Sequence, residues 1–167
     1  MKFVLDASVT MAWLLGDAKP ADRSYAQRVL EALKSPATRA EVPATWALEV
    51  ANVIARGEAK RLVSEAQSEA FLEMLASAHV LADHATFSAA LNDTLQLARR
   101  YRLSSYDASY LELALCSALP LASLDADLNR AAQGWRVAFP WVTCRSTLHR
   151  AVGDTSSALR LGNGCHD

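Results

Sequence analysis

Two short apolar runs, each ended by an aspartate, constrain the fold of this chain more than any other feature of its sequence. The run KFVL at residues 2–5 is followed by Asp6, and the run PLASL at residues 120–124 is followed by Asp125. Runs this short and this apolar predict buried strands of the kind found in parallel sheets. The chain between them changes to helical periodicity, so we expect strands that alternate with helices.

Helical patterns occupy most of the sequence between the two runs. We expect helices over residues 7–15, 22–34, 45–56, 65–76, 86–101 and 104–119, with Asp22 opening the second and a Ser64–Gln67 capping box at the fourth. Weaker strand signals lie at 40–42, 78–82 and 135–139. Because strands joined through helices run parallel and are covered on both faces, the pattern predicts an α/β fold. We expect a three-layer α/β/α sandwich with a mostly parallel central sheet.

The regular pattern stops near the C-terminus. At 167 residues the chain is long enough for one domain with its own core, which we expect to comprise residues 1–141. From residue 142 onward the sequence mixes small polar residues, glycine and scattered charge without a sustained period. We therefore expect residues 142–167 to be a tail that is disordered or binds a partner.

Several features favour a cytoplasmic protein. No window approaches the roughly 18 consecutive apolar residues of a membrane span, and Asp6 interrupts the N-terminal stretch that a signal peptide would need. The cysteines Cys116, Cys144 and Cys165 are odd in number and lack the spacing of metal ligands. The sequence therefore suggests neither a disulfide framework nor a zinc site.

The overall charge gives the chain no general attraction to nucleic acid, because the net charge is −1 and the pI is near 6.4. A polyanion would need a local basic patch. Two clusters could supply one, namely Arg56, Lys60 and Arg61, and Arg99, Arg100 and Arg102. Both fall near expected helix C-termini, where basic residues ordinarily complement the helix dipole. The sequence therefore identifies no residue as RNA-binding.

Four acids, Asp6, Glu49, Asp107 and Asp125, stand in apolar surroundings. Each has an ordinary structural explanation. Asp6 and Asp125 could cap the segments that follow them, and Glu49 could pair with an arginine. Asp107, three residues after Ser104, could belong to a capping box at the start of its helix.

The combination of the four acids points to a metal site. Asp6 and Asp125 follow expected strand ends, where ligands bind in parallel sheets, and Asp107 begins a helix near them. Glu49 shares a helix side with the apolar Trp46, so we expect it to face inward. Converging carboxylates repel each other, and loss of water raises their pKa values further unless a cation neutralises them. Oxygen ligands alone favour Mg²⁺ or Mn²⁺ over Zn²⁺, and these ions typically serve phosphate chemistry.

Four segments of the sequence together match one known family. They are FVLDASV at 3–9, TWALEVANVI at 45–54, LSSYDASYLELA at 103–114 and LASLDADL at 121–128. In their order and spacing the chain resembles the PIN-domain ribonucleases, especially the VapC toxins of type II toxin-antitoxin systems. The resemblance implies a PIN fold, dependence on Mg²⁺ or Mn²⁺, endonucleolytic cleavage of RNA, a cognate antitoxin protein and a homodimer.

The resemblance also assigns roles to individual residues. It implies that Asp6, Glu49, Asp107 and Asp125 form the acidic, metal-binding quartet, and that Ser8 and Asn52 orient these carboxylates from a second shell. Asp127 has two interpretations, since it could act through water or cap the next helix. The resemblance does not extend to residues 142–167, so His149, Asp154 and His166 receive no role.

Two other functions remain as alternatives. A PIN scaffold without catalytic activity could bind RNA or a protein partner, and fold alone does not decide between binding and cleavage. An aspartyl phosphatase could also begin with a strand ended by aspartate. That enzyme would want a second acid two residues after Asp6, where this chain has Ser8. We therefore expect a metal-dependent endoribonuclease, with the inert scaffold as its main competitor.

Overall fold

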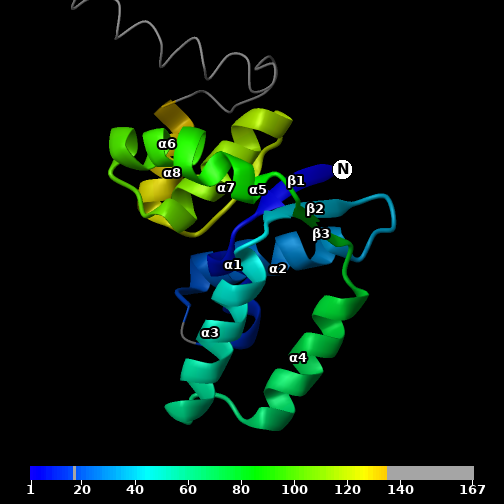
Figure 1. Cartoon of the computed structure of the whole chain (residues 1–167). Coiled ribbons are helices and arrows are strands. Elements are labelled where there is room, and N and C mark those ends of the chain that lie inside the picture. The colour runs from blue at the N-terminus through cyan, green and yellow to red at the C-terminus, as the bar shows by residue number, and fades with distance from the viewer. Residues whose placement is uncertain (17, 135–167) are drawn as a thin grey trace, which may run out of the picture.

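Four short parallel strands form the central sheet (Figure 1). They are β1 (Lys2–Leu5), β2 (Arg39–Pro43), β3 (Val80–Asp83) and β4 (Leu121–Ala122), in the spatial order β3-β2-β1-β4. The computed structural model describes residues 1–16 and 18–134. The expected strand at 135–139, the end of the expected domain and the expected tail at 142–167 lie outside the described residues.

Helices connect the strands and cover the sheet. They are α1 (Ala7–Leu14), α2 (Pro20–Leu33), α3 (Trp46–Ala59), α4 (Glu65–Ser77), α5 (Thr86–Ala89), the π-helical turn η1 (Ala90–Thr94), α6 (Leu95–Tyr101), α7 (Ser105–Ser117) and α8 (Ala126–Gly134). The helix expected over 86–101 is therefore interrupted by η1. The expectation that Asp22 opens α2 is wrong, because the helix begins at Pro20, and proline suits a first helical position whose N–H has no partner.

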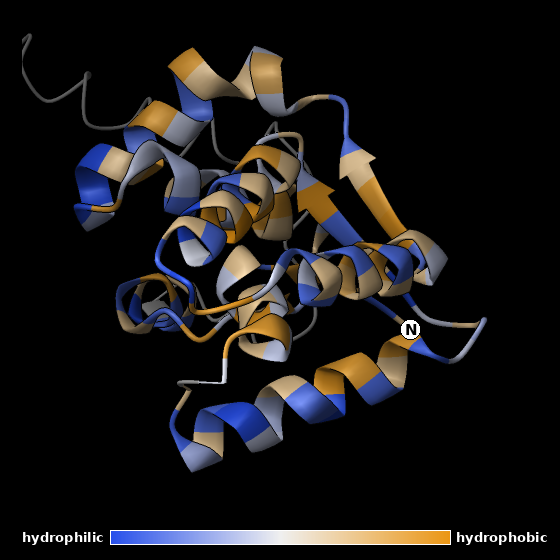
Figure 2. Cartoon of the chain, turned by 90° about the horizontal axis from the view of Figure 1, so that it is seen from below, coloured by the Kyte–Doolittle hydropathy of each residue, from blue (hydrophilic) through white to orange (hydrophobic). Residues whose placement is uncertain are grey.

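The side chains of β1 divide the apolar core into two parts. Phe3 and Leu5 belong to a cluster that includes Ala26 and Leu33 of α2, whereas Val4 belongs to a second cluster built mainly on α7. Alternate strand residues point to opposite faces, so helices cover both faces of the sheet. The helices in Figure 2 carry both apolar and polar stretches, as expected for helices with one buried side. This arrangement confirms the three-layer α/β/α sandwich.

Helix α7 is the most thoroughly buried helix near the sheet, since every residue from Ala108 to Leu115 is buried. It begins at the N-cap residue Ser104, whose hydroxyl accepts a hydrogen bond from the backbone of Asp107 (3.0 Å). It ends at Ala118, which adopts the left-handed conformation with φ of 51°. The N–H of the next residue, Leu119, returns to the carbonyl oxygen of Ala114 at 3.0 Å, as in a Schellman motif.

Candidate active site

The strand order brings the ends of β1 and β4 together. These strands are neighbours, with Leu5 opposite Ala122, and the backbone N–H of Asp6 donates to the carbonyl oxygen of Ala122 at 3.0 Å. From β1 the sheet continues to β2 and β3 on one side and to β4 on the other. The strand order therefore reverses between β1 and β4, which is where ligands bind in sheets of this kind. Asp6 and Asp125 follow these two strand ends.

Asp6 is a buried acid, with 4% of its surface exposed. Its Oδ2 atom accepts hydrogen bonds from the hydroxyls of Ser8 (2.5 Å) and Ser123 (2.6 Å). Burial raises the pKa of Asp6, the hydrogen bonds from Ser123 and Ser8 oppose this rise, and the negative charge of Asp107 adds to it. The two serines therefore fix the orientation of the Asp6 side chain, while burial disfavours its charged form.

The two serines also hold the loop that carries Asp125. The hydroxyl of Ser8 accepts a hydrogen bond from the backbone of Leu124 (3.0 Å), and the hydroxyl of Ser123 accepts one from the backbone of Asp125 (2.9 Å). Each hydroxyl thus donates to Asp6 and accepts from the loop after β4. These hydrogen bonds fix the position of the Asp125 backbone relative to Asp6.

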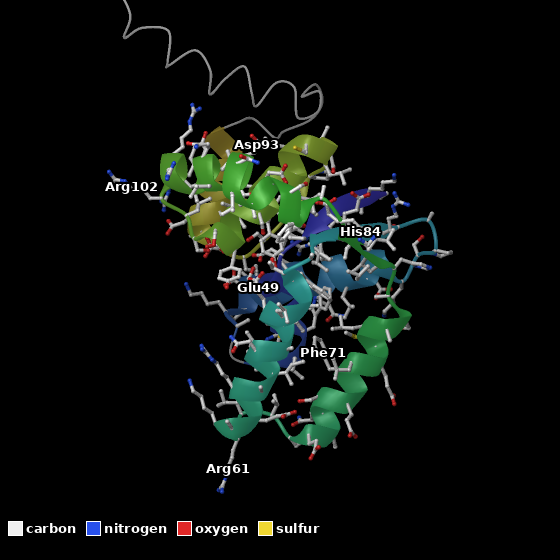
Figure 3. All side chains as sticks on the ribbon, viewed as in Figure 1. Glu49, Arg61, Phe71, His84, Asp93 and Arg102 are labelled. Atoms are coloured by element: carbon white, nitrogen blue, oxygen red, sulfur yellow. The ribbon has the colours of Figure 1, made fainter. Side chains whose placement is uncertain are left out.

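Glu49 lies in the first turn of α3 and is half-buried. Its Oε1 atom accepts a hydrogen bond from the hydroxyl of Tyr110 on α7 (2.9 Å). Burial raises the pKa of Glu49, the hydrogen bond from Tyr110 lowers it, and the negative charges of Asp6 and Asp107 raise it. Figure 3 shows Glu49 where the upper end of α3 meets the group of helices that includes α7. Glu49 therefore lies close enough to Asp6 and Asp107 for their negative charges to affect its pKa.

Asp107 is half-buried in the first turn of α7. Its Oδ2 atom accepts a hydrogen bond from the hydroxyl of Ser104 at 2.6 Å, while its backbone N–H donates to the same hydroxyl. The capping interpretation is therefore correct for the backbone of Asp107, although the carboxylate binds the serine hydroxyl instead of the serine N–H. Because its charge also raises the pKa values of Asp6 and Glu49, Asp107 belongs to the acidic group as well.

Asp125 and Asp127 have different roles from each other. Oδ1 of Asp125 accepts a hydrogen bond from the backbone of Leu128 (2.7 Å), which caps the start of α8. Asp127 forms an exposed ion pair with Arg130 (2.7 Å). The expectation that Asp125 caps the segment after it is confirmed, and the capping hydrogen bond is made by Asp125 and not by Asp127. Asn52 is exposed on α3, and within the described residues its side chain has no hydrogen bond to the acids.

Two polar residues of the site were not singled out by the sequence. Tyr110 fits the apolar periodicity of α7 and so resembles a core residue, and Ser123 stands inside the apolar run of β4. One weak sequence signal could have identified each of them as a site residue, namely its spacing from an acid. Tyr110 lies one helical turn after Asp107, and Ser123 lies two residues before Asp125 in an extended segment. Each spacing places the side chain on the same side as the acid.

The donor atoms fit a hard divalent cation in their chemistry. In the described residues no three carboxylate, imidazole or thiolate groups lie close enough together to enclose an ion as they stand. The acids that influence one another, Asp6, Glu49 and Asp107, nevertheless offer only oxygen atoms, and two of them have raised pKa values. Oxygen-only donors suit Mg²⁺ or Mn²⁺. A nearby cation would oppose the burial and the repulsion that raise the pKa values of Asp6 and Glu49.

One arginine of each basic cluster lies away from Glu49. Figure 3 shows Arg61 at the lower tip of α3 and Arg102 at the outer edge of the helices around α7, both separated from Glu49. Arg61 and Arg102 have positive φ angles of 57° and 55° and follow the ends of α3 and α6. Their positions are those of helix-terminating residues, as the alternative interpretation of these clusters predicts.

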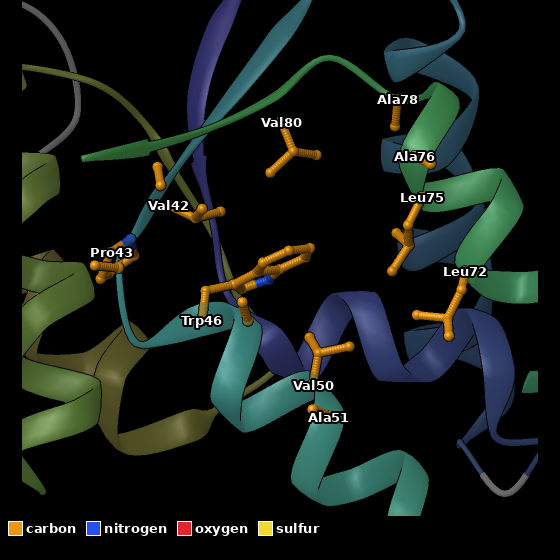
Figure 4. A pocket seen from close by; sticks show the side chains of 13 residues that line it. Val42, Pro43, Trp46, Val50, Ala51, Leu72, Leu75, Ala76, Ala78 and Val80 are labelled. Atoms are coloured by element: carbon orange, nitrogen blue, oxygen red, sulfur yellow. The ribbon is translucent and has the colours of Figure 1, made fainter. Parts of the chain in front are cut away.

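A separate hollow lies between α3 and α4. It has a volume of about 410 Å³ and is lined almost wholly by apolar side chains, including Trp46, Val50 and Leu75 (Figure 4). Trp46 also donates from Nε1 to the hydroxyl of Thr10 (3.3 Å), and this hydroxyl donates to the backbone carbonyl of Asp6 (3.3 Å). The hollow is thus joined to the acidic site by two hydrogen bonds but contains none of its acids.

No helix in the described part of the chain combines the length and the apolar character needed to cross a bilayer. The sequence profile described as PIN domain matches residues 3–134. The structure is similar to the crystal structure of PAE2754 from Pyrobaculum aerophilum, with a TM-score of 0.57, 21% sequence identity, and coverage of 92% of this chain and 90% of the other. No curated protein matches the chain.

Proposed function

Because the chain belongs to the PIN-domain family, whose members are typically nucleases, we propose that it is a metal-dependent endoribonuclease that hydrolyses RNA phosphodiester bonds. The observation that carries the proposal is the buried carboxylate of Asp6, which two serine hydroxyls hold beside the reversal in strand order. The negative charge of Asp6 also contributes to the raised pKa of the half-buried Glu49. Burial, together with nearby negative charge, raises the pKa values of Asp6 and Glu49, and acids with raised pKa values are expected where a cation and a phosphodiester bind.

The proposed metal ligands are Asp6, Glu49, Asp107 and Asp125, with Mg²⁺ or Mn²⁺ as the ion. When bound, such an ion neutralises the acids, orients the phosphodiester and stabilises charge on the leaving oxygen. The chain's own residues supply the framework. Ser8 binds Asp6 and the loop after β4, and the capping bond from Leu128 holds Asp125 at the start of α8.

The proposal extends to partners. As a VapC-like toxin the protein would act on cellular RNA in the cytoplasm, pair with a cognate antitoxin protein and form a homodimer. Two large apolar side chains support a protein partner of some kind, since Phe87 and Leu91 are 91% and 83% exposed and lie four residues apart on α5 and η1. Light scattering that finds only monomers at micromolar concentration would contradict the homodimer.

The test of the proposed function is cleavage of a labelled RNA pool with Mg²⁺ or Mn²⁺. We expect the wild type to cut, and we expect Asp107→Asn and EDTA each to abolish cutting. Glu31→Gln is a matched control, because Glu31 lies on α2, outside the proposed site. Its side chain is 65% exposed and pairs with Lys34. Cutting that survives Asp107→Asn at the wild-type rate contradicts the proposed site. Binding of RNA without cleavage by the wild type would favour the inert scaffold instead.

A further inference from the structure

Tyr110 belongs to the acidic site, although its place in the apolar periodicity of α7 predicts a core residue. Its side chain is completely buried, and its hydroxyl donates to Oε1 of Glu49 at 2.9 Å. A phenylalanine would fill the same space without a polar atom to satisfy, because burying a hydroxyl costs free energy unless it is hydrogen-bonded. The hydroxyl therefore needs an explanation beyond packing.

Tyr110 lies near Asp107 along α7 and contacts Glu49 through its hydroxyl. It follows Asp107 by one turn of α7, and Glu49 lies in the first turn of α3. Burial and the negative charges of Glu49 and Asp6 raise the pKa of Tyr110, so its hydroxyl keeps its proton and donates a hydrogen bond to Glu49. The hydroxyl thus reaches from α7 to the first turn of α3.

We propose that Tyr110 is a positioning residue, whose hydroxyl holds the Glu49 carboxylate in the orientation that binds a divalent cation. This inference rests on the proposed function. Glu49 has three freely rotating side-chain bonds and is only half-buried, so packing alone does not fix its carboxylate. The hydrogen bond from a rigid, buried ring removes that freedom. Partners that orient metal-binding carboxylates are typically worth about 10- to 100-fold in metal affinity or activity.

The test compares Tyr110→Phe with Tyr25→Phe in binding of Mn²⁺, followed by the rise in melting temperature as Mn²⁺ is added. Tyr25→Phe is a matched control, because Tyr25 lies on α2 with the apolar cluster on the other face of the sheet. We expect Tyr110→Phe to weaken Mn²⁺ binding about 10-fold and Tyr25→Phe to leave it unchanged. Equal binding by the wild type and both variants overturns the inference.

A kinetic experiment separates positioning from a general loss of structure. We expect Tyr110→Phe to raise the Mn²⁺ concentration for half-maximal cleavage by the same factor of about 10, with the KM for RNA unchanged at saturating Mn²⁺. A change in the KM for RNA with unchanged Mn²⁺ dependence overturns the inference. If Tyr110→Phe alone does not fold, Ala118→Gly is added to both the wild type and the variant, because glycine adopts the positive φ at the end of the same helix without strain and so stabilises the fold.

A double-mutant cycle tests whether Tyr110 acts through Glu49. In Glu49→Gln the charge is lost, so we expect Tyr110→Phe to cause no further loss of Mn²⁺ affinity in that background. A further 10-fold loss there would show that Tyr110 acts on another group and would overturn the inference. If the wild type neither binds Mn²⁺ nor cleaves RNA, the proposed function itself fails. If the wild type binds Mn²⁺ and Tyr110→Phe binds it with equal affinity, only the inference about Tyr110 fails.

Discussion

Asp6 and Asp125 have the same local sequence pattern and different environments. Each follows a short apolar run, and the two strands are neighbours in the sheet. Asp6 is buried, binds two serine hydroxyls and has a raised pKa, and its side chain does not cap α1. The carboxylate of Asp125 caps α8. A strand that is followed by aspartate therefore predicts that the acid lies at the end of the sheet. The residues around the acid in the folded protein decide whether its carboxylate is buried or caps a helix.

The largest expected effect concerns cleavage of RNA. Asp6→Asn keeps an oxygen that can accept from both serines but removes the charge, and we expect it to reduce the cleavage rate by at least about 100-fold, the upper range for residues that only orient metal ligands. If Asp125 also binds metal, Asp125→Asn has an equal effect, although its cap is preserved. Single-turnover cleavage measures both rates. Full activity in Asp125→Asn would limit that residue to capping.

The shift in melting temperature on addition of Mn²⁺ should show whether Asp6 belongs to the metal site. We expect added Mn²⁺ to raise the melting temperature of the wild type by several degrees, because a ligand at 100 times its Kd stabilises by about 2.7 kcal/mol. Asp6→Asn should abolish this rise. Differential scanning calorimetry with and without Mn²⁺ provides the measurement, and an equal rise in the wild type and Asp6→Asn would remove Asp6 from the metal site.

Without metal the burial of Asp6 and Glu49 should make stability fall as pH rises. Their pKa values in the folded protein are raised above 3.8 and 4.5, so the folded state binds more protons than the unfolded state between those values and the raised ones. By linkage the free energy of unfolding decreases as pH increases through that window and is constant above it. Asp6→Asn should flatten this dependence and raise the metal-free melting temperature at pH 7 by a few degrees. Urea unfolding from pH 3 to pH 8 in EDTA measures the slope, and an unchanged slope in Asp6→Asn contradicts the buried charge.

The capping role of Asp125 predicts a smaller effect on stability. Asp125→Ala removes the acceptor for the N–H of Leu128 and should lower the free energy of unfolding by about 1 kcal/mol, whereas Asp125→Asn should keep most of it. Thermal unfolding without metal compares the two variants. Equal stability of the alanine and asparagine variants would mean that this hydrogen bond contributes nothing measurable.

Asp127 should give the smallest effect. It lies two residues after Asp125, but its exposed ion pair with Arg130 is of a kind that contributes about 0–1 kcal/mol. We expect Asp127→Asn to change stability by less than about 0.5 kcal/mol and to leave the cleavage rate unchanged. A loss of cleavage in this variant would show that Asp127 acts on the site through water, the interpretation that its contacts disfavour.

The sequence by itself determined most of the elements and their order, although it did not predict the interruption at η1 and the helices expected from it did not include α8. Apolar runs gave the positions of β1 and β4, and the Ser64–Gln67 capping box marked the start of α4, where both of its hydrogen bonds are present. These signals are local, because periodicity and caps depend on residues within a few positions of each other. The same local signals also placed the four acids at strand ends and in the first turns of helices, and the family motif marked them as a set.

Only the tertiary structure decided how these residues meet. The partners of Asp6 and Glu49 come from distant parts of the chain, since Ser123 lies 117 residues after Asp6 and Tyr110 lies 61 residues after Glu49. No pattern within one helix or strand reveals such contacts, because they depend on strand order and on which helix covers which face. Tyr110 looks like a core residue in the sequence because its ring is buried in the core. Only the tertiary structure shows that its hydroxyl donates a hydrogen bond to Glu49 on another helix.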